Sequence, residues 1–192
     1  PASTARAILR AVVAMVTNPD PEMQTNAAGS LACLCRDHPD NQAAIARSGA
    51  IPPLCTMVRE GAVVETREES AAALWALATD NAANKSTIAK LGGIEPLVNM
   101  LMYGQSENSS IKAAGALAAL AAQHSDNRQT ITKRMVNVLG SKAPATRAVR
   151  LLSALASLCD NEPTNQVAIA KTGGVTHLIV WLANSSEEVQ VQ

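Results

Sequence analysis

The sequence predicts an all-α fold, a solenoid in which three-helix repeats stack along one axis. One motif occurs four times, at separations of 43, 43 and 38 residues, and it begins at Asn41, Asn84, Asn127 and Asn165. Periods of about 40 residues are typical of stacked helical arrays. A leucine precedes each of these asparagines by ten residues (Leu31, Leu74, Leu117 and Leu155). Because both patterns recur along the chain, we expect residues 1–192 to form one elongated domain.

The recurring motif predicts the first helix of each repeat and the start of the second. We expect each recurring asparagine to be the N-cap of a short first helix, where its side chain would accept a backbone hydrogen bond. Gly49 and Gly92 are then expected to end that helix in a left-handed conformation. Pro52 and Pro96 follow and would open the second helix, where a missing N–H costs nothing.

The third helix is predicted from the alanine-rich stretches that contain the recurring leucines. Apolar residues recur in these stretches at helical spacing. Small residues one turn earlier, such as Gly29 and Gly115, would let third helices of adjacent repeats approach closely. We therefore expect a partial repeat over 1–40, full repeats over 41–83 and 84–126, a shortened repeat over 127–164 and an incomplete one over 165–192.

The shortened repeat lacks the residues that separate its first two helices. Nine residues lead from Ile88 to Leu97, but only four lead from Ile131 to Met135. The missing residues are the glycine turn and the proline, so no helix breaker remains. We predict one continuous or gently bent helix over 128–139 in place of two.

Composition argues against partners that bind through overall charge or by spanning a bilayer. Sixteen basic and sixteen acidic residues give a formal net charge of zero, so we expect no nucleic-acid partner. The longest apolar run, 113–122, is about half of the roughly 20 residues needed to cross a membrane. No membrane span is expected.

The four cysteines, Cys33, Cys35, Cys55 and Cys159, lie within helical patterns and lack the paired spacing of a metal site. We interpret them as reduced packing residues, although Cys33 and Cys35 lie about 200° apart around a helix. Reduced cysteines favour an intracellular location, and we expect the cytoplasm rather than the nucleus. We expect no metal and no cofactor.

Signals of catalysis are also missing from the sequence. There is no nucleophile motif, no phosphate-binding glycine loop and no carboxylate pair tied to a histidine. His38 and His124 each lie three residues before a recurring asparagine, which makes them one loop position in two repeats. We interpret both as structural loop residues and expect that the chain is not an enzyme.

The three-helix unit, the anchor Asn-Gln-x-x-Ile-Ala-x-x-Gly-Gly-Ile-x-x-Leu and the stretch Ala73-Leu-Trp-Ala-Leu77 together resemble armadillo repeats over essentially the whole chain. The resemblance implies a right-handed superhelix. In that family, which includes importin-α, β-catenin and plant U-box proteins, third helices line a concave groove that holds extended peptides. By this resemblance we expect a scaffold that binds a protein or peptide partner, whose identity the sequence does not indicate.

The resemblance also places a groove on this chain. Its predicted residues are Arg36, Trp75, Thr79, Ala118, Ala122, Ala156 and Asp160. The remaining lining would be small or apolar: Ala28, Ala32, Cys35, Ala71, Ala78, Ala114, Ala121, Leu152 and Cys159. Importin-like grooves hold an asparagine four residues after each tryptophan, and no asparagine occupies that position here. The resemblance therefore disfavours nuclear-import signals as ligands. Trp75 has an alternative role, packing between neighbouring long helices.

Four cations recur six residues after the anchor asparagines and form a predicted basic ladder of Arg47, Lys90, Lys133 and Lys171. A ladder of this kind could hold an acidic strip of a partner. The alternative is that a cation in the last turn of a short helix complements the helix dipole, by roughly 0.3 to 1 kcal/mol.

Two classes of function remain open. The first is a peptide-binding scaffold, favoured by a lone tryptophan in a channel of small residues. The second is a structural spacer or self-associating module of a larger multidomain protein, of which we expect this chain to be a fragment. It would use weak end-to-end stacking and is favoured by an apolar face that the last incomplete repeat would leave uncovered.

Overall fold

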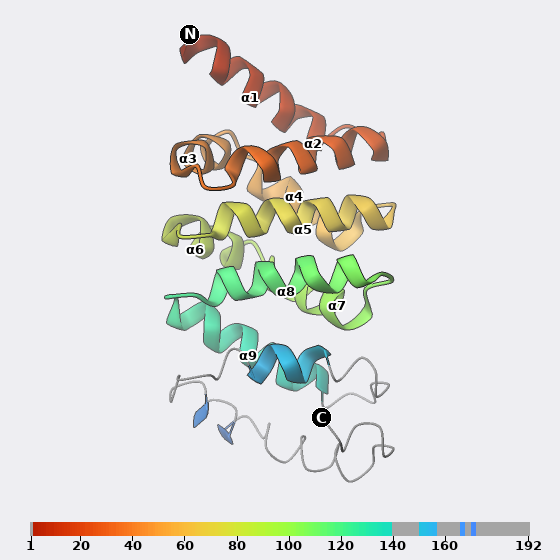
Figure 1. Cartoon of the computed structure of the whole chain (residues 1–192), viewed down its shortest axis with the longest axis vertical. Coiled ribbons are helices and arrows are strands. Elements are labelled where there is room, and N and C mark those ends of the chain that lie inside the picture. Colours follow the sequence, from red (N-terminus) through yellow and green to blue (C-terminus); the bar gives the residue numbers. More distant parts are fainter. Residues whose placement is uncertain (1, 140–149, 157–165, 168–169, 172–192) are drawn as a thin grey trace.

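The computed structural model describes residues 2–139, 150–156, 166–167 and 170–171, in which α-helices stack into a column (Figure 1) and no β-strand occurs. The helices are α1 (Ala2–Val16), α2 (Pro21–Cys35), α3 (Pro39–Arg47), α4 (Ile51–Glu60), α5 (Val64–Ala78), α6 (Ala82–Lys90), α7 (Ile94–Tyr103), α8 (Glu107–Ala121) and α9 (Ser125–Leu139). A further helical segment covers 150–156.

The predicted three-helix repeat is present twice, as α3–α4–α5 and as α6–α7–α8. The third helices α2, α5 and α8 lie one below another as parallel rungs, and α4 and α7 stand behind them (Figure 1). The most extensive helix contacts are those of α2 with α5 and of α5 with α8. The all-α solenoid that the sequence predicted is therefore confirmed.

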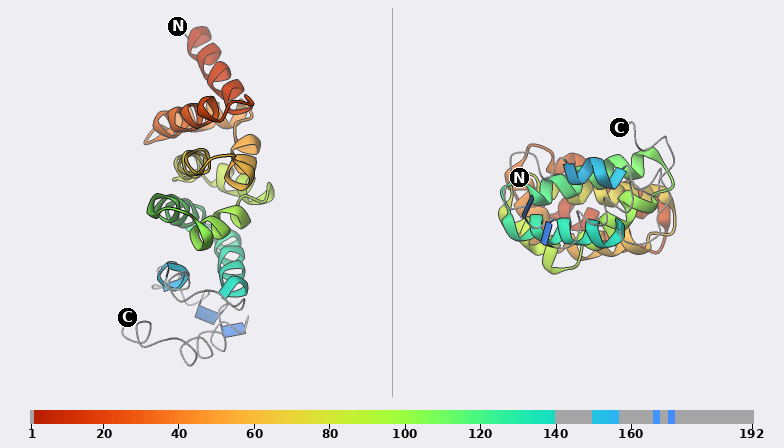
Figure 2. Two further views of the ribbon diagram at one scale, coloured as in Figure 1. Left: turned by 90° about the vertical axis from the view of Figure 1, so that its right-hand side faces the viewer. Right: turned by 90° about the horizontal axis from the view of Figure 1, so that it is seen from below.

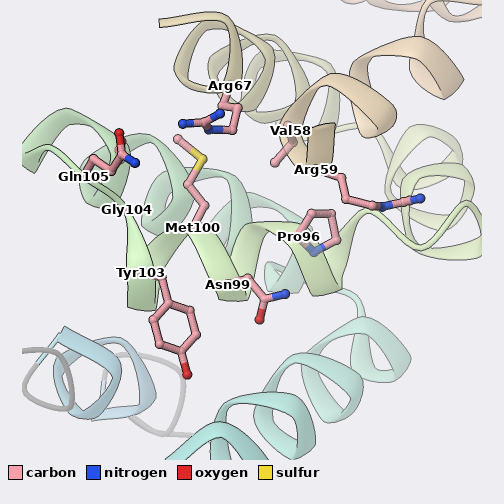
Figure 3. Close-up of a pocket in the computed structure, with 10 residues that line it drawn as sticks. Val58, Arg59, Arg67, Pro96, Asn99, Met100, Tyr103, Gly104 and Gln105 are labelled. Carbon is pink, nitrogen blue, oxygen red and sulfur yellow. The ribbon is translucent and has the colours of Figure 1, made fainter. Parts of the chain in front are cut away.

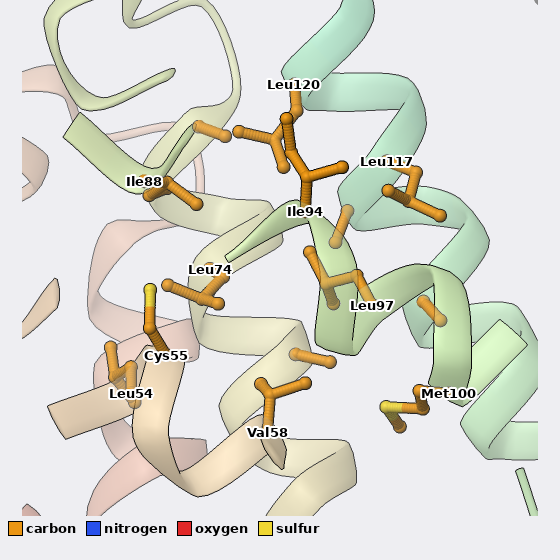
Figure 4. Close-up of a cluster of buried hydrophobic side chains, with 14 of the residues drawn as sticks. Leu54, Cys55, Val58, Leu74, Ile88, Ile94, Leu97, Met100, Leu117 and Leu120 are labelled. Atoms are coloured by element: carbon orange, nitrogen blue, oxygen red, sulfur yellow. The ribbon is translucent and has the colours of Figure 1, made fainter. Parts of the chain in front are cut away.

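The core runs along the whole column because each repeat contributes the same positions to it. Leu31 and Leu74 have no exposed surface, and Leu117 and Leu155 are also buried, so the predicted helix phase is confirmed. Second-helix residues meet them from behind, and Figure 4 shows Leu97 lying between Leu74 and Leu117. Each repeat thus buries its apolar side chains against its neighbours.

The glycine and proline positions behave as predicted. Gly49 has φ 84° and Gly92 has φ 75°, and each follows the end of a first helix. Only glycine adopts this left-handed backbone without a steric cost. Pro52 lies in the first turn of α4 and Pro96 in the first turn of α7.

The prediction that the recurring asparagines are N-caps is wrong. Helix α6 begins at Ala82 and its cap is Asn81, whose side chain accepts from the backbone N–H of Asn84 at 3.1 Å. Asn84 lies inside the first turn and donates its amide to the carbonyl of Leu77 at 2.9 Å. The same bond joins Asn41 to Leu34 and Asn127 to Leu120. The last carbonyls of a helix lack intrahelical partners, and the asparagine amide satisfies one of them.

At Asn41 and Asn84, the residue after the anchor asparagine connects the first helix of the repeat to the end of the third helix of the same repeat. Gln42 donates its amide to the carbonyls of Ala76 and Thr79, at 2.9 and 3.1 Å. Lys85 occupies the same position one repeat later, and its ammonium donates to the carbonyl of Ala122 at 2.5 Å. Both side chains are buried. They satisfy carbonyls at the end of the third helix of their own repeat. The anchor asparagines Asn41 and Asn84 instead bond back to the third helix of the preceding repeat, so consecutive repeats are joined by polar as well as apolar contacts.

Helix α9 confirms the prediction for the shortened repeat, because it is a single helix that spans the region of two. His124 precedes it, and its Nδ1 accepts from the backbone N–H of Asn127 at 3.3 Å. The Nε2 of His124 lies 2.9 Å from the hydroxyl oxygen of Ser86. His124 is therefore a structural loop residue, as predicted. His38 occupies the same position before α3 but forms no side-chain cap.

The interpretation of the cysteines is correct for two of them. Cys35 and Cys55 are buried free thiols, and burial raises their pKa values to about 12 and about 11. Cys33 is exposed, so its assignment as a packing residue is wrong. Two residues about 200° apart on one helix do not reach the same core. Cys159 lies outside the described residues.

Two further observations concern membranes and metals. Within the described ranges, no helix is both long enough and apolar enough to cross a bilayer. The same ranges contain no group of three or more histidine, cysteine or acidic side chains placed to hold a metal ion.

Candidate functional site

The predicted groove residues lie on the third helices, which share one side of the column (Figure 2, left). We call the exposed surface of α2, α5, α8 and the 150–156 segment the third-helix face. Its predicted residues Arg36, Ala118, Ala122 and Ala156 are exposed, and Thr79 is half-buried. Asp160, the last predicted groove residue, lies outside the described part of the chain.

Most of the small residues that were predicted to line the groove are buried instead. These are Ala28, Ala32, Cys35, Ala71, Ala78 and Ala121. The third helices pack against one another, α2 against α5 and α5 against α8, and each also packs against the second helix that precedes it. Burial therefore covers more of the helix circumference than the leucine side alone, and the small residues form helix contacts. Ala114 and Leu152 are half-buried, and Cys159 lies outside the described residues.

Trp75 combines the two roles that the sequence left open. Its side chain lies on Gly115 of the next third helix, where an added Cβ would come within 2.4 Å of the ring carbon Cζ3. Trp75 nevertheless keeps 40% of its surface exposed. The ring therefore packs between neighbouring long helices and also presents an aromatic surface to solvent.

The polar groups around Trp75 are largely engaged. The hydroxyl of Thr79 donates to the carbonyl of Trp75 at 3.0 Å, so its donor is used within the helix. Lys112 pairs with Glu69 across α5 and α8 at 2.5 Å, and both side chains are partly covered. Arg36 forms no ion pair with any described residue. It is an exposed cation at the carboxyl end of α2.

The basic ladder is exposed at all four positions, Arg47, Lys90, Lys133 and Lys171. Arg47 and Lys90 lie in the last turns of α3 and α6, where a cation complements the helix dipole. Lys133 lies within α9, which continues to Leu139. The dipole explanation therefore does not apply to Lys133.

A pocket that the sequence analysis missed lies between the second helices α4 and α7 (Figure 3). Its volume is about 190 Å³, and its lining includes Arg59, Arg67, Asn99 and Gln105. Arg59, Arg67 and Gln105 do not recur at the equivalent positions of the preceding repeat, which hold Val16, Gln24 and Ala62, so the repeat pattern did not mark them. A comparison of the repeats for positions that differ, instead of positions that recur, would have indicated them.

Comparison with known proteins matches the repeat and the fold. Residues 38–79 match the family model described as Armadillo/beta-catenin-like repeat. The chain is similar to the crystal structure of an engineered protein at 26% identity and TM-score 0.71, over 95% of this chain and 74% of that one. A second engineered protein matches at 26% identity and TM-score 0.69, over 95% of this chain and 45% of that one.

A designed armadillo repeat protein in complex with peptide (KR)4 has the same fold, with 22% identity and TM-score 0.68 over 94% of this chain and 77% of that one. No curated protein sequence matches the chain significantly.

Proposed function

Since this chain belongs to the armadillo-repeat family, we propose that it is a non-catalytic scaffold that binds an extended segment of a partner protein on its third-helix face. The observation that carries the proposal is the exposed, packed ring of Trp75. Large aromatic side chains dominate the binding energy of protein interfaces when a partner covers them. The same face belongs to rigid helices, which hold the ring before a partner arrives.

Packing on Gly115 supports this role because it fixes the ring. A side chain that is already ordered loses little conformational entropy on binding. The exposed fraction of Trp75 could take an aliphatic side chain, or a cationic one through its π face. Arg36 lies on the same face and would pair with an acidic residue of the bound segment.

The designed relative that was solved with peptide (KR)4 supports a peptide as the ligand class. In this chain the positions four residues after the tryptophan position hold Arg36, Thr79 and Ala122 instead of asparagine. No amide ladder is available to grip the peptide backbone. We therefore expect micromolar affinity at best, about −8 kcal/mol.

The basic ladder is proposed as a secondary contact for an acidic strip of the same partner. Retention of a cation at Lys133, where no helix ends, supports a role beyond dipole compensation. Reversing charge at Lys90 and Lys133 together should weaken such a contact and reduce its salt dependence.

Self-association through the end of the column remains the second candidate. Ile8 and Met15 on α1, the first helix of the column, are 57% and 42% exposed, so a second copy of the chain could cover them there. Light scattering coupled to size-exclusion chromatography tests it. A concentration-dependent mass that falls to the monomer value in Ile8→Glu would favour this candidate.

The test of the scaffold proposal uses peptides selected from a displayed random library on the wild-type chain. Their affinities are then measured for Trp75→Ala and for Leu91→Ala. Leu91 is a matched control because it has the same 40% exposure but lies in the turn between α6 and α7. We expect Trp75→Ala to lose at least about tenfold in affinity, the effect of an interface hot spot, and Leu91→Ala to lose none. Unchanged binding by Trp75→Ala would refute the site.

A further inference from the structure

The pocket between α4 and α7 is separate from the third-helix face, because these second helices stand behind α5 and α8 (Figure 1). The start of α5 and the connection from α7 to α8 close one end of it, through Arg67 and Gln105 (Figure 3). Its floor is apolar and consists of Val58, Pro96 and Met100, all buried.

The rim of this pocket is cationic and polar. Ten residues line it, and they include Arg59 and Arg67 but no acidic side chain. Arg67 lies beside Met100, and Arg59 extends past Pro96 on the other side (Figure 3). Arg59 also lies 3.8 Å from Glu60, but both side chains are more than half exposed, so solvent screens that pair. The buried carboxylate of Glu68, next to Arg67 in sequence, already accepts from the hydroxyls of Ser106 and Ser109.

The preceding repeat provides an internal control for this rim. The positions 43 residues before Pro96 and Met100 hold the same residue types, Pro53 and Met57. The rim differs, because Arg59, Arg67 and Gln105 correspond to Val16, Gln24 and Ala62. Residues that stacking requires recur from repeat to repeat. The apolar floor is therefore part of the fold, whereas the cationic rim is not required by stacking.

One hydrogen bond of Arg67 shows that the fold requires a donor at this position but not a positive charge. The guanidinium of Arg67 donates to the carbonyl of Gly61 at 2.5 Å. Gln24 makes the equivalent bond one repeat earlier, donating to the carbonyl of Asn18 at 2.7 Å. A neutral amide thus suffices for the structural contact. Arginine has five N–H donors, so Arg67 keeps others for a ligand while this bond holds its head in place.

We propose that the α4–α7 pocket binds a glutamate side chain of a partner protein, with the methylenes on the apolar floor and the carboxylate on Arg67. The volume of about 190 Å³ corresponds to roughly six waters. It is smaller than the roughly 300 to 1,000 Å³ of small-molecule sites, so it suits one side chain. Arginine pairs with carboxylates through two parallel hydrogen bonds, and the amides of Asn99 and Gln105 supply further donors.

The experiment uses methyl-labelled methionine and arginine Nε–H signals in NMR spectra of the full chain. The probes are N-acetylglutamate methylamide, the matched glutamine compound and inorganic phosphate. The glutamate probe should shift Met100 and Arg67 saturably, and the glutamine probe should bind at least about tenfold more weakly, since it lacks the charge-assisted bonds. This result does not depend on binding at the third-helix face.

The deciding variant is Arg67→Gln, which reproduces the bond seen at Gln24 and removes only the charge. We expect an unchanged melting temperature and glutamate shifts reduced to the glutamine level. Arg59→Gln should weaken the response in part, and Arg10→Gln, an exposed arginine on α1, should leave it unchanged. Equal shifts from the glutamate and glutamine probes, or full binding by Arg67→Gln, would overturn the proposal. A stronger response to phosphate would overturn the choice of carboxylate.

Discussion

The contact between Trp75 and Gly115 predicts that Gly115→Ala lowers the stability of the wild-type chain but raises the stability of a Trp75→Ala chain. Gly115→Ala adds a methyl group 2.4 Å from a Trp75 ring carbon, so the ring must leave its position. In an otherwise free helix the same change stabilises, by about 1 kcal/mol, because alanine has the higher helix propensity. Which effect dominates depends on how much Trp75 contributes where it lies.

The magnitude follows from the burial of the ring. Trp75 is 40% exposed, so most of its surface is covered. A large aromatic side chain buries up to about 250 Å² when fully covered, which suggests about 150 Å² here. At about 25 cal/mol per Å² this burial contributes at most about 4 kcal/mol. Displacing the ring should cost about half of that, so Gly115→Ala should destabilise the wild type by about 1 kcal/mol net.

Removing Trp75 first should reverse the result. In a Trp75→Ala background nothing opposes the new methyl group, and Gly115→Ala should stabilise by up to about 1 kcal/mol. The four chains form a double-mutant cycle, measured by urea unfolding followed by circular dichroism at 222 nm. Stabilisation of both backgrounds, or equal destabilisation of both, would refute the packing of Trp75 on Gly115.

Three further predictions concern the helix junctions and the thiols. Asn84→Ala should lower stability by about 1 to 2 kcal/mol because the carbonyl of Leu77 loses its donor. Urea unfolding checks this, and a neutral result would show that water replaces the amide. Gly92→Ala should cost about 1 kcal/mol from its φ of 75°, and calorimetry should detect a lower melting temperature. In a Cys159→Ser chain at pH 8, a thiol reagent should modify Cys33 alone until the protein unfolds, because burial holds the pKa values of Cys35 and Cys55 at about 12 and about 11. Those raised pKa values also mean that both thiols contribute stability that is fully present below their unfolded pKa of about 9 and lost as pH rises toward 12.

The parts of the fold that recur were predictable from sequence. Leu31 and Leu74 occupy one buried position because each repeat must cover the same surface of its neighbour. The single helix α9 was predictable for a different reason, since the deletion removed every helix breaker between two helical segments. Periodicity and the special backbone of glycine and proline supplied these results.

Contacts that depend on three-dimensional neighbours were not predictable. Recurrence marked Asn84 as important but did not show that its amide reaches back to Leu77 across the turn. A helical wheel placed Ala71 and Ala78 on an open side, yet the adjacent third helices cover them. The α4–α7 pocket escaped notice because Arg67 and Gln105 break the pattern that the sequence analysis followed.

Binding at the third-helix face is the central claim, and the indole N–H signal of Trp75 tests it most directly. The signal is assigned by its loss in Trp75→Phe, and the wild-type chain is then titrated with a peptide selected from the displayed library. We predict a saturable shift of the Trp75 indole together with the backbone signals of Ala118 and Ala122, which are exposed on the same face. A peptide that binds saturably while all three signals stay unchanged would contradict the claim.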